Sequence, residues 1–170
     1  MTTAKEILNY YCPQQDGTLK SPTELLNVEG TIWGALLYGP IYVPETTVVN
    51  GVVFLRSWHE QDQGLFVKNR EDLLSRISGL PKEVREERLS DYNWIEIKLA
   101  IGGDWFPARS SQRMVRDCYR LLARNLVGAW DAILHRRYPE RFFEVRILEE
   151  LETGGSLGVG FKEVSKAVAP

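Results

Sequence analysis

The spacing of apolar positions changes several times along the chain, and between residues 46 and 58 it is typical of strands. Two runs of β-branched and aromatic residues flank the pair Asn50-Gly51. This pair favours a type I′ turn, because both of its residues accept positive φ angles, and it therefore predicts an antiparallel hairpin. We also expect a third antiparallel strand over residues 65–68, and one bent or two short strands over the apolar stretch 31–43, which glycines and a proline interrupt.

Polar and charged residues dominate the next segment, residues 69–90, which predicts two short helices. Asn69 can cap the first helix, and Gly79 can end it. Pro81 suits the first position of the second helix, whose residues are almost all charged and are therefore expected at the surface. A further short helix, followed by a loop, is expected within residues 1–30.

Residues 94–101 alternate between apolar and polar side chains, which is the period of a strand with one buried face. The apolar positions on that face are Ile95, Ile97, Leu99 and Ile101. Two further strands are expected in the segment 141–164, on either side of the turn sequence Thr-Gly-Gly-Ser. These two strands would form a second antiparallel hairpin.

The longest predicted element is a helix that begins after Ser110 or Ser111 and ends near Tyr138, where Pro139 stops it. Its residues divide between an arginine-rich face and an apolar face, the pattern of a helix that packs on one side. We expect the apolar face to lie on the sheet. It comprises Val115, Cys118, Leu122, Leu126, Ala129 and Ile133.

The predicted strands are grouped and do not alternate one by one with helices, which favours an α+β fold. We expect a single domain in which the long helix packs across an antiparallel or mixed sheet, with short helices at the N-terminus and in the middle of the chain. No internal repeat or linker divides the 170 residues. The expected parts are an N-terminal helix and loop at 1–30, a β-meander at 31–68, two short helices at 69–90, and a strand, the long helix and a hairpin at 94–164.

The composition favours a globular, cytoplasmic protein. Apolar residues make up 44% of the chain and charged residues 26%, and the five tryptophans favour a substantial core. Cys12 and Cys118 have no metal-binding or redox spacing, and no apolar run has the length of a membrane-spanning helix. Because the formal net charge is −2, nucleic-acid binding would have to depend on a local basic patch.

Arginine is concentrated in the long helix. Eight of the fourteen arginines and none of the seven lysines fall within residues 109–141, where only three residues are acidic. At about 100° per residue, four arginines lie within about 80° of one another on one face, and Arg109 joins them if the helix extends back by one turn. These four are Arg113, Arg116, Arg120 and Arg124. Guanidinium groups bind carboxylates or phosphates in a bidentate way, so the face is a candidate binding site for an anionic partner.

Two interpretations of this face are open. It could be only the hydrated side of an amphipathic helix, with Asp117, Asp131 and the acidic stretch 149–152 as internal partners. Alternatively, it binds an anionic partner, and the pair Trp105-Phe106 in the preceding loop provides apolar anchors.

The function we expect is that of a non-catalytic accessory or adaptor protein that binds an acidic protein or a ribonucleoprotein through this face. Direct binding of nucleic acid is one alternative, and an enzyme acting on a phosphorylated or acidic metabolite is another. That enzyme would have to place His59 near Arg109 and Arg113. No catalytic residue, cofactor or metal site is predicted, because His59 and His135 lack further zinc ligands and no nucleotide-binding or nucleophile motif occurs.

Overall fold

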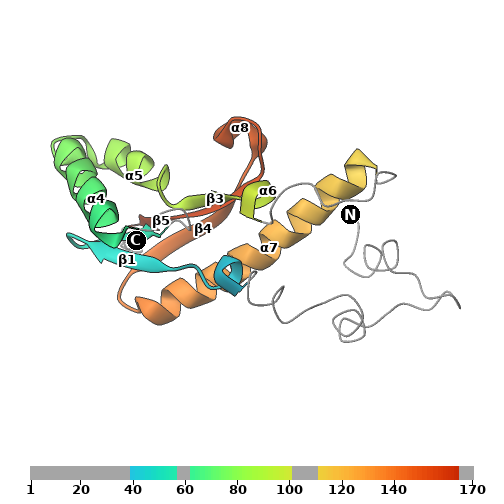
Figure 1. The fold of residues 1–170 in the computed structure, drawn as a ribbon, viewed down its shortest axis with the longest axis horizontal. Coiled ribbons are helices and arrows are strands. Elements are labelled where there is room, and N and C mark those ends of the chain that lie inside the picture. Colours follow the sequence, from blue (N-terminus) through green and yellow to red (C-terminus); the bar gives the residue numbers. More distant parts are fainter. Residues whose placement is uncertain (1–38, 57–61, 101–110, 165–170) are drawn as a thin grey trace, which may run out of the picture.

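The computed structural model describes residues 39–56, 62–100 and 111–164, and Figure 1 shows their arrangement. The helix expected within residues 1–30 and most of the stretch 31–43 lie outside the described residues. The helices and strands are β1 (Thr46–Val49), β2 (Val52–Leu55), α4 (Gln63–Ile77), α5 (Lys82–Ser90), β3 (Trp94–Glu96), α6 (Ile97–Ala100), α7 (Gln112–Arg137), β4 (Phe142–Leu148), α8 (Glu150–Thr153) and β5 (Gly158–Val164).

The hairpin predicted around Asn50-Gly51 is confirmed. β1 pairs antiparallel with β2, and Val49 lies opposite Val52 at the closed end. The φ angles of Asn50 and Gly51 are 47° and 84°, the left-handed values that a type I′ turn requires. Local sequence alone therefore specifies this turn and the register of the hairpin.

A second antiparallel sheet has the strand order β3-β5-β4. Two glycines of β5 allow Trp94 of β3 to pack closely against the central strand. A Cβ atom at Gly158 would lie 2.8 Å from Cε3 of Trp94, and one at Gly160 would lie 2.8 Å from the Cβ atom of Trp94. The two strands expected in the segment 141–164 are thereby confirmed, and α8 occupies the connection between them.

The long helix is confirmed as α7, which packs against β4 and β5 of this sheet (Figure 1). Ser111 caps the helix, because its hydroxyl oxygen accepts a hydrogen bond from the backbone N–H of Met114 at 3.2 Å. Together the described elements form the single α+β domain that the sequence predicts. Within the described ranges, no helix has both the length and the apolar character that crossing a membrane requires.

The buried face of α7 is not the one that the sequence predicts. Of the six residues expected there, only Leu126 is fully buried. The buried face is turned by about 80° around the helix axis, toward the arginines. It comprises Ala123, Leu126, Trp130 and Leu134. As a consequence, Arg116 and Arg120 lie beside the buried face and not opposite it.

Trp130 accounts for this rotation. Its ring is 1% exposed and lies edge-on against Phe161 of β5, with ring centroids 6.3 Å apart and an interplanar angle of 71°. Its indole N–H donates a hydrogen bond to the carbonyl oxygen of Ile41 at 2.7 Å. A buried tryptophan needs both a large apolar contact and an acceptor for its N–H, and this position of the helix supplies both.

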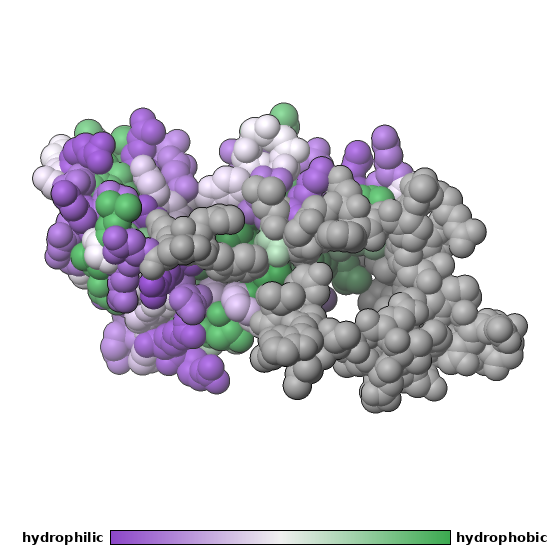
Figure 2. Space-filling view, viewed as in Figure 1, coloured by the Kyte–Doolittle hydropathy of each residue, from purple (hydrophilic) through white to green (hydrophobic). Residues whose placement is uncertain are grey.

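A smaller core lies between α4 and the β1–β2 hairpin. Its buried apolar residues are Val49, Phe54, Phe66, Leu73 and Ile77. The guanidinium group of Arg70 is buried beside it, with its Cζ atom 4.7 Å, 5.0 Å and 5.6 Å from the ring centres of Phe66, Tyr92 and Phe54. The ring faces offset part of the cost of burying this charge through cation–π attraction. Figure 2 shows hydrophilic side chains over this end of the molecule, and α5 has no buried residue, as its charged sequence predicts.

Asn93 joins the two sheets. Its side chain is almost completely buried. The side-chain oxygen accepts a hydrogen bond from the N–H of Leu55 at 2.8 Å, and the side-chain N–H donates to the carbonyl of Val53 at 3.1 Å. The backbone carbonyl of Asn93 accepts a hydrogen bond from the N–H of Phe161 at 2.9 Å. One residue thus satisfies buried polar groups of β2 and of β5, which belong to different sheets.

Residues 65–68 belong to α4, so the prediction of a third strand of the meander is wrong. Asp62 caps this helix by accepting hydrogen bonds from two backbone N–H groups, at 2.9 Å and 3.2 Å. Asn69, which was predicted to cap this helix, lies inside it. A run of three apolar residues fits a strand or a helix. Here the segment is helical, because the apolar residues over the whole of α4 recur at helical spacing and their side chains pack together against the hairpin. These residues include Phe66, Leu73 and Ile77.

The alternation over residues 94–101 is a strand only at its beginning. β3 ends at Glu96, which pairs with Gly158, the first residue of β5. The next residue, Ile97, is fully buried and begins α6, and its N–H donates to the carbonyl of Leu157 at 3.0 Å. The backbone hydrogen bonding between the two segments thus continues to Leu157, one residue beyond the last pair of β3 and β5, before the chain turns into a helix.

Residues 39–42 form a helical turn, whereas strand structure was predicted for the whole stretch 31–43. Pro40 lacks a backbone N–H and suits the first turn of a helix. The N–H of Val43 donates to the carbonyl of Gly39 at 2.9 Å and closes this turn.

We expect Asn93→Ala to lower the free energy of unfolding by about 2–4 kcal/mol, because it leaves a buried N–H and a buried C=O of β2 without partners. Denaturant unfolding followed by circular dichroism measures the change. The matched control is Asn125→Ala, which removes the same side chain from an exposed position of α7 and should change stability by less than about 0.5 kcal/mol. Equal stabilities of the two variants would contradict the joining role of Asn93.

Candidate functional site

Four of the arginines singled out in the sequence lie in a row along α7, which we call the arginine row: Arg113, Arg116, Arg120 and Arg124. The row begins in the first turn of the helix and occupies its N-terminal half. Figure 1 shows that this N-terminal half of α7 extends beyond the strands. Arg113, Arg116 and Arg124 are exposed, and the side chain of Arg120 is 39% exposed. The other residues predicted for this site, Trp105, Phe106 and Arg109, lie outside the described residues, as does His59.

One member of the arginine row is neutralised by the chain itself. The guanidinium group of Arg120 donates to both carboxylate oxygens of Glu149, at 3.2 Å and 2.8 Å. Glu149 belongs to the acidic stretch that was considered as an internal partner. The pair is exposed to water and contributes at most about 1 kcal/mol to stability, but it holds the side chain of Arg120 toward α8.

The other three members have no such partner among the described residues. Neither an ion pair nor a hydrogen bond links the guanidinium groups of Arg113, Arg116 and Arg124 to any acid in residues 39–56, 62–100 and 111–164. Asp131, one of the two acids of the helix considered as partners, has a carboxylate oxygen 3.3 Å from Nδ1 of His135, near the C-terminal end of the helix. The internal acids therefore neutralise the row only in part.

The arginines at the C-terminal end of the segment have a structural role that sequence reasoning missed. Arg137 donates to the carbonyl of Pro44 at 2.6 Å. Arg141 donates to the carbonyl of Gly51 at 2.6 Å and pairs with Glu163 at 3.0 Å. Both side chains bind the backbone of the β1–β2 region to α7 and the sheet. The sequence places neither of them on the face of the arginine row, but it does not reveal their backbone acceptors, which are about 90 residues away in the chain.

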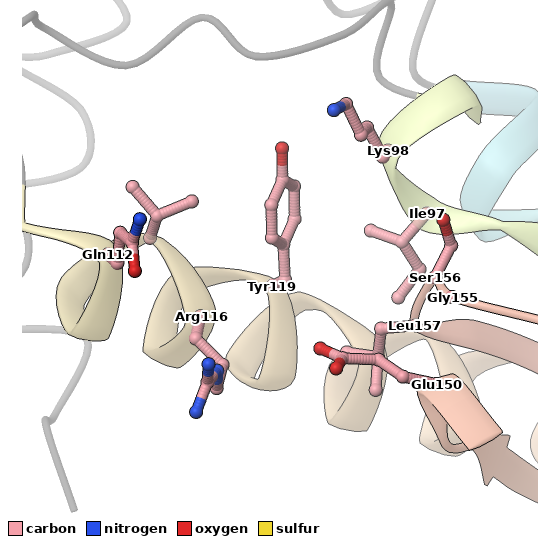
Figure 3. Close-up of a pocket in the computed structure, with 10 residues that line it drawn as sticks. Ile97, Lys98, Gln112, Arg116, Tyr119, Glu150, Gly155, Ser156 and Leu157 are labelled. Carbon is pink, nitrogen blue, oxygen red and sulfur yellow. The ribbon is translucent and has the colours of Figure 1, made fainter.

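A hollow of about 360 Å³ lies beside the arginine row, between α6, α7 and the connection from β4 to β5. Its apolar lining comes from Ile97, Val115 and Leu157, and its polar lining includes Lys98, Arg116, Tyr119 and Glu150. Figure 3 shows the ring of Tyr119 projecting from α7 toward α6, while Glu150 projects from the α8 side toward α7. Sequence reasoning did not predict this hollow, because its walls come from separate segments that only the fold brings together.

Local sequence holds α8 in place at the edge of the hollow. Glu149 and Glu152 form a reciprocal capping box, and Gly154 ends the helix with a φ angle of 80°. The carboxylate of Glu152 accepts the backbone N–H of Glu149 at 2.9 Å and pairs with Arg146 at 2.6 Å. The backbone hydrogen bond, followed by the interaction with Arg146, lowers the pKa of Glu152 below its usual value.

Two features of the described residues bear on the enzyme alternative: the thiol of Cys118 and the grouping of metal-ligating side chains. Burial, and to a smaller extent the charge of Asp117, raises the pKa of Cys118, which favours the protonated form of this thiol. In the described part of the chain, no three side chains of the types His, Cys, Asp and Glu are grouped so that they could hold a metal ion. What the geometry offers is a cationic helix face next to a hollow with an apolar lining.

We expect the pKa of Glu152 to be lower in the folded protein than in the urea-unfolded protein. Since the folded value is the lower one, ionised Glu152 stabilises the fold above the unfolded-state pKa, and this contribution is lost as the pH falls through the folded-state pKa. NMR titration of the side-chain carboxyl carbon measures both values. Arg146→Gln should raise the pKa of Glu152 in the folded protein only part of the way to its unfolded value, because the backbone hydrogen bond remains. Identical values in the two states would contradict the proposed capping interaction.

Comparison of the chain with protein-family models, with curated proteins and with solved structures found no significant match. A functional proposal for this protein therefore depends on the chemistry and geometry of its own residues.

Proposed function

We propose that this protein is a non-catalytic accessory or adaptor protein that binds an acidic protein or a ribonucleoprotein through the arginine row of α7. The observation that supports the proposal most directly is that Arg113, Arg116 and Arg124 have no acidic partner among the described residues. Guanidinium groups form bidentate hydrogen bonds with carboxylates and phosphates, so the exposed row offers several such contacts side by side.

The spacing of the row supports an external anion on energetic grounds. Neighbouring members are separated by three or four residues, so their charges lie close together on the helix surface. Each like-charge pair at this spacing destabilises a helix by a few tenths of a kcal/mol, and the pair of Arg120 with Glu149 offsets part of the repulsion. Arg113 also lies in the first turn, where the helix dipole disfavours a cation. A bound anionic partner removes these unfavourable terms.

The length of the row favours a macromolecule over a small ligand. From Arg113 to Arg124 the helix rises by about 16 Å, which exceeds the reach of one phosphate or carboxylate group. Trp105, Phe106 and Arg109 remain part of the proposal on sequence grounds alone, as apolar anchors and as a further cation next to the start of α7. The alternative of an enzyme acting on a small anionic metabolite gains no specific support from the described residues.

A triple charge reversal of the exposed members tests the proposal. We expect Arg113→Glu/Arg116→Glu/Arg124→Glu, the row variant, to recover a partner from lysate at least tenfold less efficiently than the wild type, because several bidentate contacts are lost. Affinity capture with quantitative mass spectrometry, with and without nuclease, measures this. The matched control is Lys68→Glu/Arg88→Glu/Arg136→Glu, which changes the net charge equally at exposed positions elsewhere. If the row variant and the control retain the same partners, the arginine row is only a hydrated surface.

The row variant should fold as well as the wild type. Removing neighbouring like charges should increase the free energy of unfolding by at most a few tenths of a kcal/mol per pair. The melting temperature should therefore be unchanged or slightly higher. Thermal unfolding followed by circular dichroism checks this expectation. A clear loss of stability would instead show that the arginines form structural contacts.

The salt dependence of binding separates the two kinds of anion. If the partner is a protein with apolar anchors, affinity should fall modestly between about 50 mM and 200 mM salt, whereas a nucleic acid that contacts several arginines should lose orders of magnitude. Fluorescence anisotropy with the purified partner measures the slope. A steep slope together with nuclease-sensitive capture would favour direct nucleic-acid binding over the acidic-protein proposal.

A further inference from the structure

We propose that the hollow between α6, α7 and the β4–β5 connection receives an apolar side chain from an acidic polypeptide that lies along the arginine row. This inference rests on the proposed function and specifies the partner: a peptide segment in which an apolar residue stands next to carboxylates. The same segment would then contact the cationic face through charge and the hollow through burial of apolar surface.

The lining of the hollow fits an apolar side chain. Ile97 is fully buried and Leu157 is 9% exposed, and together with Val115 of α7 they provide the apolar part of the wall. A hydrocarbon group placed there contacts carbon atoms and loses its contact with water, which is favourable in proportion to the area buried. The ring of Tyr119 adds a flat apolar surface from the helix side (Figure 3).

The hollow and the arginine row are parts of one surface. Arg116 belongs to both, because it lines the hollow and stands between Arg113 and Arg120 in the row. Lys98 adds a second cationic side chain from α6. An apolar side chain in the hollow therefore brings the neighbouring residues of its own chain within reach of cationic groups of the protein.

The acidic residues of α8 restrict where the partner's carboxylates can lie. Glu149 is paired with Arg120 and Glu152 with Arg146, whereas Glu150, at the start of α8, lines the hollow. The carboxylate of Glu150 repels negative charge at the α8 edge and leaves the first two turns of α7, at Arg113 and Arg116, as the favourable region. The surface thus prefers one arrangement, with the apolar group in the hollow and the charges toward the start of α7.

This arrangement favours a polypeptide over a nucleic acid. A polynucleotide carries a phosphate at every nucleotide, so a strand entering the hollow would bring phosphates near Glu150. Among the described residues that line the hollow, Tyr119 is the one aromatic residue, whereas sites for single strands use several rings for base stacking. A peptide can place a neutral apolar residue at the hollow and carboxylates elsewhere.

The test uses two fluorescently labelled Glu-Ser repeat peptides of equal length and charge, which differ only in a central residue, leucine or serine. We expect the leucine peptide to bind the full-length protein about tenfold more tightly in fluorescence anisotropy, the scale that burial of one such side chain allows. A single-stranded oligonucleotide of equal charge serves as the third probe and should bind more weakly than the leucine peptide.

Filling the hollow should abolish the preference for leucine without changing any charge. Ser156→Phe places a ring in the hollow from the β4–β5 connection, and Val115→Phe does so from α7, so the two variants approach from opposite walls. The matched control is Ser75→Phe at an exposed position of α4. We expect both filled variants to bind the two peptides equally, with the affinity of the serine peptide for the wild type, while the control keeps the preference.

The outcomes separate this inference from the proposed function. Equal binding of both peptides to the wild type, together with weaker binding by the row variant, would overturn the role of the hollow and leave the arginine row as a binding face. Tighter binding of the oligonucleotide than of either peptide would overturn the inference in favour of a nucleic acid. Peptide binding that the row variant leaves unchanged, or no binding of any probe, would contradict both proposals.

Discussion

The architecture depends on the buried amide of Asn93. No strand of one sheet pairs with a strand of the other. The side chain of Asn93 forms hydrogen bonds with the N–H of Leu55 and the carbonyl of Val53, two buried backbone groups of β2. The backbone carbonyl of the same residue bonds to β5. Because buried polar groups are costly when unpaired, these hydrogen bonds hold the hairpin against the three-stranded sheet, and Arg137 and Arg141 add contacts to the hairpin region from α7 and the loop after it.

The long helix α7 has two halves with different roles. The C-terminal half buries Trp130 and Leu134 in the main core and, through Arg137, binds the backbone before β1. The N-terminal half carries Arg113 and Arg116, extends beyond the strands in Figure 1 and borders the hollow. A rigid scaffold at one end thus presents a charged, accessible surface at the other, which is an arrangement suited to contact with a partner.

The rotation of α7 connects its packing to the candidate site. The face of α7 centred on Trp130 packs on the sheet. The arginine row therefore lies next to the buried face and not directly opposite it. Arg120 can therefore reach Glu149, and Arg116 can line the hollow. If the expected apolar face had been the buried one, the arginines would point straight into water, away from α6 and α8. The packing of one large side chain thus decides which residues share a surface with the row.

The sequence by itself determined the features that depend on neighbours in the chain: the Asn50-Gly51 turn, the capped start of α7 at Ser111, the two strands β4 and β5, and the arginine face as a pattern. Local rules suffice there, because turn angles and caps involve only a few adjacent residues. Only the tertiary structure decided that residues 65–68 are helical, that β3 stops at Glu96, and which arginines are structural. These outcomes depend on partners distant in the sequence: the hairpin that α4 covers, the strand β5 whose first residue lies opposite Glu96, and the acceptor atoms that folding brings to the arginines.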